Sequence, residues 1–367
     1  MTARQFYIIV CLFVITTKMQ RFASLLFSEA GKDGYILILI YAVVNIIGIL
    51  LAFFIYKFLN TDKFKNEKTY IIFSSLKKLV MLATTLYFVI QALLLFEHVQ
   101  NIFADTLFDK FAWSIFSLLF LFAIFFLART GIKNIALNFE LYGLLIIGSL
   151  IVIGVMGATQ ADYSCVLPFE TISISGLLSC FGKFNIWFGD FFIILYMLFH
   201  TNKPKLSKTI LSYGLSIVFL TFLVITFYGV YGDYSAIQPG LVSSITEQSI
   251  LGLNIGRVDW FLILIAEFGT ILSCSVCIYF ASKTFGSVFP NVKPIILMII
   301  IAVAFYVMNV FVLADKFVVK DFFFGIGGKL SLILKLFTTF ILVFISLKDR
   351  FEKKKLKNLE AQNGKIS

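Results

Sequence analysis

Two short polar clusters interrupt long apolar stretches of the sequence, and their residue types could bind a small charged molecule. Ile15–Lys18 (ITTK) divides two apolar runs near the N-terminus, and Phe188–Asp190 (FGD) divides two others near the middle of the chain. Glycine weakens a helix, and an ionised aspartate costs about 2.5–3.5 kcal/mol at the centre of a membrane helix. Such interruptions are tolerated at membrane depth where the chain is buried in protein or lines a polar cavity. We therefore predict that both clusters belong to one binding site.

Each interruption would leave backbone groups without a partner inside its own helix. Amide N–H groups at the start of a half-helix hold a carboxylate, whereas free carbonyl groups hold an ammonium group or a cation. A zwitterionic amino acid suits two such breaks that meet near the middle of the bilayer. Tyr87 and Gln91 are four residues apart in one apolar run, and Glu267 and Thr270 are three apart in another, so each pair would share a helix face toward the site. The ligand-binding residues predicted in this way are Thr16, Thr17, Lys18, Tyr87, Gln91, Phe188, Gly189, Asp190, Glu267 and Thr270.

The charged residues within apolar stretches have alternative interpretations. Lys18 either pairs with Asp190, where its ammonium group would take the place of a coupling sodium ion or proton, or reaches outward to the lipid headgroups. We expect Arg21 to reach the headgroups. Lys335 lies near enough to the end of its apolar run to do the same, so we assign it no function. Glu267 is either a proton-sensitive group or a protonated glutamate that hydrogen-bonds to a neighbouring helix.

The composition is that of a membrane protein. Of the 367 residues, 60% are hydrophobic and 14% are charged, which is unlike a water-soluble domain of this length. The net charge of +11 is spread over short loops and the C-terminal tail, so it indicates membrane topology rather than nucleic-acid binding. Cys274 and Cys277 form one C-x-x-C inside an apolar run, and the two histidines lie at opposite ends of apolar runs. We therefore expect no metal site, no cofactor and no enzymatic activity.

Ten apolar runs are long enough to cross about 30 Å of hydrocarbon at 1.5 Å per residue. They lie near residues 5–28, 35–58, 76–97, 111–128, 140–157, 181–200, 208–231, 257–282, 292–314 and 329–347. Because the first and sixth runs are the interrupted ones, we predict one all-α membrane domain, 1–347, with five-span repeats over 5–157 and 181–347. Lysine and arginine are enriched in alternate loops, which predicts that both termini and the basic tail 348–367 are cytoplasmic.

Several stretches of the chain resemble the B subunits of spore germinant receptors, a branch of the amino acid/polyamine/organocation permease superfamily. The similar stretches are Thr2–Gln5, Glu29–Asp33, Leu127–Ala136 (LARTGIKNIA), Leu167–Pro168, Phe188–Asp190 and Gly256–Asp259 (GRVD). Together with the length and the ten predicted spans, they extend the resemblance over nearly the whole chain. The first break differs from the family pattern, because it carries Lys18 and Arg21 and lacks the usual glycine and following proline.

The resemblance implies a LeuT-like core of two inverted five-helix repeats, with a small germinant, typically an amino acid, bound between spans one, three, six and eight. It also implies that the protein works with an A subunit and a lipoprotein C subunit in the inner spore membrane. A secondary transporter of amino acids or related small organic solutes is the alternative, because a sensor and a transporter would share such a site. An enzyme that builds envelope polysaccharide is disfavoured, because it would need a large outer loop with clustered arginine or histidine, and the sequence has no such loop between the predicted spans.

Overall fold

The protein is helical throughout the part of the chain that its computed structural model describes. That part comprises residues 1–19, 21–59, 67–106, 110–166, 180–238, 240–250, 258–307, 322 and 324–363. No strand occurs in these ranges, so the predicted all-α fold is confirmed for them. Leu167–Pro168 and the first two residues of Gly256–Asp259 lie outside the described ranges.

The helices are joined mostly by short turns. The α-helices are α1 (Ala3–Thr16), α2 (Phe22–Ala30), α3 (Gly34–Leu59), α4 (Glu67–Thr106), α5 (Lys110–Thr130), α6 (Ile132–Ala158), α8 (Asp190–Leu198), α9 (Leu206–Tyr231), α10 (Leu241–Ile250), α11 (Val258–Val288), α12 (Pro294–Val307) and α14 (Ile326–Asn363). The 3₁₀ helices are η1 (Gly31–Asp33), η2 (Tyr163–Cys165), η3 (Asn185–Trp187) and η4 (Gly232–Ile237). Within the motif Leu127–Ala136, Gly131 makes the turn from α5 to α6 at φ 91°, a backbone conformation that favours glycine.

Several of these helices have the length and composition of membrane spans. Seven segments in the described part qualify, namely Phe22–Lys57, Leu76–Glu97, Ile132–Ala158, Cys180–Leu198, Leu206–Ile237, Phe261–Val288 and Ile326–Lys348. Three shorter apolar helices are Ala3–Thr16, Leu118–Thr130 and Met298–Val307, which coincide with predicted spans one, four and nine. Every predicted span thus overlaps a described helix. The number of crossings and the repeat of five plus five spans stay predictions.

The outer surface carries large apolar side chains, as expected of a protein surrounded by lipid. Leu141 and Leu144 of α6 are 65% and 80% exposed, and Phe340 of α14 is 73% exposed. Further exposed leucine, isoleucine and phenylalanine side chains lie on α3, α9 and α12. A soluble protein rarely exposes so much contiguous apolar surface, whereas hydrocarbon is a suitable solvent for it.

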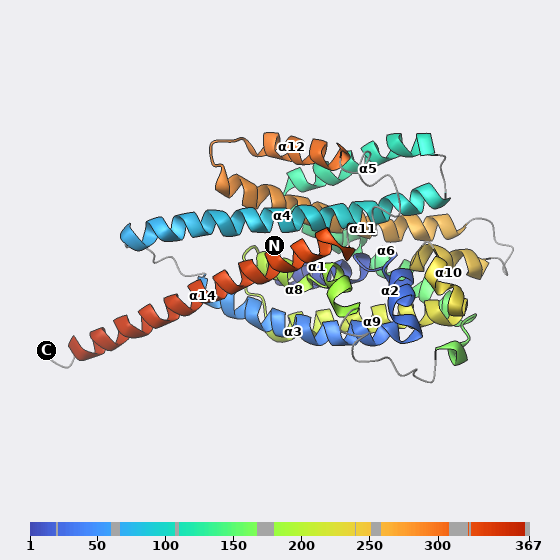
Figure 1. Ribbon diagram of the computed structural model, residues 1–367, viewed down its shortest axis with the longest axis horizontal. Coiled ribbons are helices and arrows are strands. Elements are labelled where there is room, and N and C mark those ends of the chain that lie inside the picture. The colour runs from blue at the N-terminus through green and yellow to red at the C-terminus, as the bar shows by residue number, and fades with distance from the viewer. Residues whose placement is uncertain are drawn as a thin grey trace.

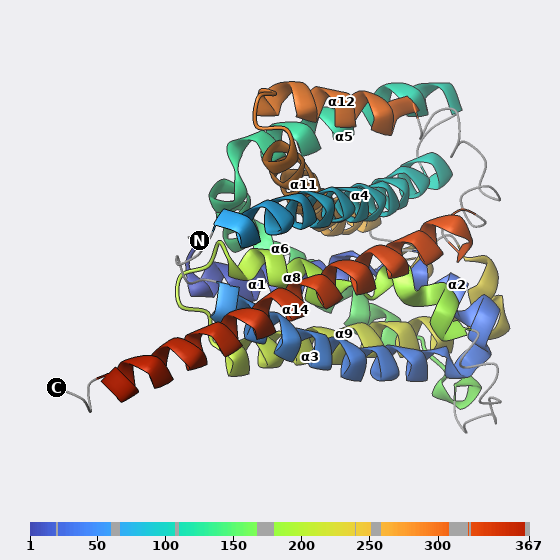
Figure 2. The same cartoon turned by 60° about the vertical axis from the view of Figure 1, so that its left-hand side comes forward.

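The helices that contain the two predicted breaks lie in the interior. Figure 1 shows α1 and α8 between α3 and α9 on one side and α4 and α11 on the other, with α5 and α12 outermost, and Figure 2 shows the same order. Within an 18-residue apolar stretch of Cys180–Leu198, 78% of the residues are buried, against 39% in the corresponding stretch of Ile132–Ala158. The α14 helix crosses this arrangement and contacts α3, α4 and η3. Both breaks therefore lie among packed helices rather than at the outer surface of the molecule.

Two helices extend furthest beyond the apolar runs that predicted them. The α4 helix begins at Glu67 and ends at Thr106, and α14 continues to Asn363, far into the predicted tail 348–367 (Figure 1). Lysine, glutamate, leucine and arginine, which dominate the sequence after residue 347, are good helix formers. The apolar runs therefore predicted where these two helices lie and underestimated their length.

Candidate functional site

The first break separates α1 from α2 and is stabilised by polar contacts within the break itself. The α1 helix has 14 residues and covers roughly 21 Å at 1.5 Å per residue, less than the thickness of the hydrocarbon. Its carbonyl groups near the C-terminus are used locally: the amide of Lys18 donates to the Ile15 oxygen at 3.0 Å, and the hydroxyl of Thr17 donates to the Val14 oxygen at 3.2 Å. The predicted interruption of the first span is confirmed.

The second break lies between a helical stretch over residues 180–184, extended by η3, and α8. Phe188 and Gly189 leave the helical conformation, and α8 begins at Asp190. The hydroxyl of Tyr87, from α4, donates to the Gly189 oxygen at 3.3 Å. A Cβ atom added to Gly189 would lie 1.9 Å from that hydroxyl oxygen, so a side chain does not fit at this position. The predicted interruption of the sixth span is confirmed, and its glycine is required by close packing.

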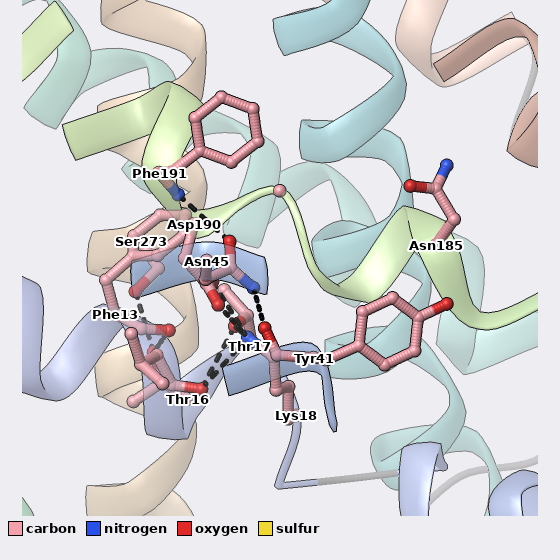
Figure 3. A network of polar contacts seen from close by, with 12 residues as sticks. Phe13, Thr16, Thr17, Lys18, Tyr41, Asn45, Asn185, Asp190, Phe191 and Ser273 are labelled. Atoms are coloured by element: carbon pink, nitrogen blue, oxygen red, sulfur yellow. Dashed lines mark hydrogen bonds and ion pairs between the residues drawn. The ribbon is translucent and has the colours of Figure 1, made fainter. Parts of the chain in front are cut away.

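The two breaks meet through a buried ion pair (Figure 3). The ammonium nitrogen of Lys18 lies 2.8 Å from Oδ1 and 3.1 Å from Oδ2 of Asp190. Lys18 is 0% exposed and Asp190 is 3% exposed. The same ammonium group donates to the hydroxyl of Thr17 at 3.2 Å and to the carbonyl of Val14 at 3.4 Å, so it has oxygen acceptors on both breaks. The predicted pairing is confirmed, and the alternative position of Lys18 at the headgroups is wrong.

Aromatic rings form one wall of this ion pair. Phe188 stacks on Tyr41 of α3 with ring centroids 3.9 Å apart and an interplanar angle of 3°. The Lys18 ammonium lies 5.3 Å from the centroid of the Phe188 ring, within the range of a cation–π interaction. On the far side of the same tyrosine, Phe181 stacks at 4.2 Å and its carbonyl accepts a hydrogen bond from the Tyr41 hydroxyl. The aromatic wall excludes water from the pair and so strengthens its electrostatic attraction.

The end of α1 is also held by α11. The hydroxyl of Thr270 donates to the carbonyl of Thr16 at 3.4 Å, and the hydroxyls of Thr16 and Ser273 are 2.7 Å apart. Glu267 is buried on the same helix, three residues before Thr270. Gln91 is buried one turn beyond Tyr87, and in the described part of the chain no hydrogen bond joins its side chain to either break. The structure therefore brings Thr270 and Tyr87 to the breaks but gives Gln91 no such contact.

Asn45 of α3 was missed by the sequence analysis although it links two parts of the site. Its side-chain oxygen accepts a hydrogen bond from the amide of Phe191 at 3.3 Å, in the first turn of α8, and its Nδ2 donates to the Tyr41 carbonyl at 3.1 Å. Figure 3 shows Asn45 between these two residues. Tyr213 of α9, also missed, lies beside the Asp190 carboxylate. A lone asparagine within an apolar helix must find a polar partner, and that signal could have identified Asn45.

Two predicted headgroup contacts are wrong. Lys335 is 2% exposed, and its ammonium nitrogen lies 2.8 Å from both the carbonyl oxygen and the side-chain oxygen of Asn185. The Nη1 atom of Arg21 forms an ion pair with Oε1 of Glu97 at 3.1 Å. In both cases another segment of the protein supplies the acceptor. Lys335 is thus a buried cation at η3, although it was predicted to reach the membrane surface.

Comparison with known families identifies the chain. A family model described as spore germination protein matches residues 1–317. The chain belongs to this family. A comparison with curated proteins finds no match. The protein is therefore a germination-related, permease-like membrane protein, and the spore germination proteins are not an enzyme family. The matched region includes both breaks and all ten predicted ligand-binding residues, and it ends before Lys335.

Proposed function

We propose that the protein is the germinant-sensing membrane subunit of a spore germination receptor and that it binds a small molecule, such as an amino acid, where the two breaks meet. The observation that supports this most is the Lys18–Asp190 ion pair, because it joins the broken first span to the broken sixth span in the interior. Half-helix ends near the centre of a membrane protein offer free peptide dipoles to a polar ligand. We place the ligand between Thr16–Lys18 and Phe188–Asp190, with Tyr87, Gln91, Glu267 and Thr270 around it.

The proposed architecture is a LeuT-like core of ten spans in two inverted repeats, 5–157 and 181–347. Both termini would be cytoplasmic, in the inner spore membrane. Basic side chains gather at the end of the molecule that carries the N-terminus, around a cavity of about 470 Å³ that is lined by Arg4, Lys203, Lys205 and Lys208 among others. Such an excess of lysine and arginine is typical of the cytoplasmic side and supports this orientation. The expected partners are a receptor A subunit and a lipoprotein C subunit.

The test is ligand-dependent thermal stabilisation of the purified full-length chain across the twenty amino acids. A ligand present at 100 times its dissociation constant stabilises the folded state by about 2.7 kcal/mol, which raises the unfolding temperature measurably. Tyr87→Phe, which removes a hydroxyl at the second break, should weaken the response, whereas Lys203→Gln, at the basic cavity, should leave it intact. If no amino acid raises the unfolding temperature of the wild-type chain, amino-acid sensing is wrong; the function fails as a whole if the related carboxylates and amines described below also give no shift.

A secondary transporter remains the second candidate, because the paired breaks suit transport as well as sensing. The Lys18 ammonium already occupies the carbonyl and carboxylate oxygens that would hold a coupling cation. A fixed cation favours a sensor over an ion-coupled transporter. Uptake of radiolabelled amino acids into proteoliposomes separates the two functions: accumulation against a gradient would assign transport, and binding without accumulation would support sensing.

A further inference from the structure

The charges buried around the second break do not balance. Lys18, Asp190 and Lys335 are all at least nine-tenths buried, and they supply two ammonium groups but one carboxylate. Asp190 is engaged by Lys18 through both of its oxygens. Lys335 has no carboxylate within ion-pair distance among the described residues, and its hydrogen bonds go to the two oxygens of Asn185, which are neutral. Two buried ammonium groups thus share the single negative charge of Asp190, which lies near Lys335 but forms its ion pair with Lys18. A buried ammonium group without an anion of its own is costly, so the site favours one additional negative charge.

The position of Lys335 also decides which group of a ligand the break can accept. The Asn185 carbonyl belongs to the end of the first half of the sixth span, where free carbonyl groups suit an ammonium group. Lys335 occupies that carbonyl at 2.8 Å, and Lys18 occupies the Val14 carbonyl at the first break. Side chains of the protein therefore already fill acceptors that would hold the ammonium group of an amino acid.

We propose that the central site selects its ligand by a carboxylate group rather than by an ammonium group, and that Lys335 receives this carboxylate. The inference rests on the proposed function, because it names the chemical class of the ligand for the same site. It assigns a binding role to a residue of α14 that lies beyond the region matched by the family. The ligand class is then small organic carboxylates, with or without an amino group.

A ligand carboxylate can take the place of the Asn185 side chain at Lys335. The side-chain oxygen of Asn185 lies 2.8 Å from the Lys335 ammonium nitrogen. The side-chain nitrogen of Asn185 makes only one long contact, 3.5 Å to the Gly328 carbonyl oxygen. The asparagine side chain is thus weakly held and can rotate away. A hydrogen bond between two charged groups is roughly twice as strong as one between neutral groups, so a carboxylate displaces the neutral amide oxygen.

The test uses matched sets of small molecules on the purified full-length chain. For alanine, the set is L-alanine, L-lactate, ethylamine and L-alaninamide; for valine, it is L-valine, L-2-hydroxyisovalerate, isobutylamine and L-valinamide. The readout is the dissociation constant from the shift in unfolding temperature. In the set that binds, the amino acid and the hydroxy acid should bind within a few-fold of each other, and the amine and the amide at least tenfold more weakly.

Variants of two residues then connect the preference to Lys335. Lys335→Met, which keeps the length of the side chain, should weaken binding of the hydroxy acid at least tenfold, whereas Lys335→Arg should retain most of it. Lys329→Met is the matched control, because Lys329 is exposed on the same helix. Asn185→Asp places a permanent carboxylate at Lys335; it should raise the unfolding temperature of the ligand-free protein and abolish binding of the hydroxy acid.

The outcomes separate this inference from the proposed function. Binding of the amine or the amide as tightly as the hydroxy acid would overturn the carboxylate preference and leave the sensing function standing. Equal binding by Lys335→Met and Lys329→Met would overturn the role of Lys335. If no member of either set binds, and the panel of twenty amino acids also gives no shift, the proposed function fails and this inference fails with it.

Discussion

The ion pair between Lys18 and Asp190 makes a quantitative prediction about stability. Lys18→Met removes the charge and keeps the length of the side chain, and Asp190→Asn removes the charge and keeps the shape. Each single substitution leaves the opposite charge buried without its partner, because the two residues are 0% and 3% exposed. Breaking a buried pair in this way costs about 3–5 kcal/mol.

The structure predicts that the two single variants differ. After Lys18→Met, Asp190 still has Lys335 as a nearby cation, so the loss should lie near the lower limit, about 3 kcal/mol. After Asp190→Asn, two buried ammonium groups remain without a carboxylate, and the loss should approach about 5 kcal/mol. The double variant should fall within about 2 kcal/mol of the wild type, because replacing both members of a buried pair by neutral groups is often nearly neutral.

The assay is reversible unfolding of the purified chain in mixed micelles, with the four proteins of the cycle measured side by side. The matched control is the exposed pair of Arg4 and Glu140, whose Nε and Oε1 atoms are 3.2 Å apart and whose arginine is 78% exposed. Its coupling energy should be below about 1 kcal/mol. Purely additive losses from Lys18→Met and Asp190→Asn would refute the reasoning, because they would show that the two charges do not stabilise each other.

Three further predictions concern the contacts that hold the breaks. Gly189→Ala should destabilise the protein by about 1–3 kcal/mol, because its Cβ would lie 1.9 Å from the Tyr87 hydroxyl oxygen. Tyr87→Phe in the same chain should recover part of the loss, and Gly182→Ala, which meets nothing within 4 Å, should have little effect in the same unfolding assay. Asn45→Leu should cost about 1–3 kcal/mol, because the Phe191 amide loses its acceptor inside the protein; a loss no larger than that of the outward-facing Val43→Ala, measured in parallel, would contradict this. Ser273→Ala should cost about 1 kcal/mol through its hydrogen bond with Thr16, and the double variant with Thr16→Val should show non-additive losses; the exposed Ser207→Ala is the control.

The two breaks could be predicted from the sequence because their cause is local. A glycine followed by an aspartate, or a lysine after two threonines, is unfavourable in an apolar helix whatever surrounds it. The pairing of Lys18 with Asp190 followed only as one of two alternatives. The headgroups and the partner aspartate are both reachable by a long side chain, and the sequence does not give the distance between the two breaks.

Lys335 and Arg21 could not be placed from the sequence for a related reason. Their distance to the membrane surface was judged along their own helices, whereas their acceptors come from other segments. Asn185 precedes Lys335 by 150 residues, and Glu97 follows Arg21 by 76. A lysine in an apolar run therefore predicts that an acceptor must exist, but it does not predict whether lipid or protein supplies it.

Each half-helix end at the centre of the molecule is held by a different neighbouring helix. The end of α1 is held by α11 through Thr270, and the start of α8 by α3 through Asn45. The turn at η3 is held by α14 through Lys335, and Gly189 by α4 through Tyr87. A ligand that binds between the breaks must exchange some of these contacts for its own, and it can shift the protein only by the difference in its affinity for the two arrangements. A carboxylate at Lys335 would replace the Asn185 side chain while leaving the Asn185 carbonyl bonded to Lys335 and Lys18 joined to Asp190. Binding would therefore first loosen the contact of α14 with η3, without breaking it.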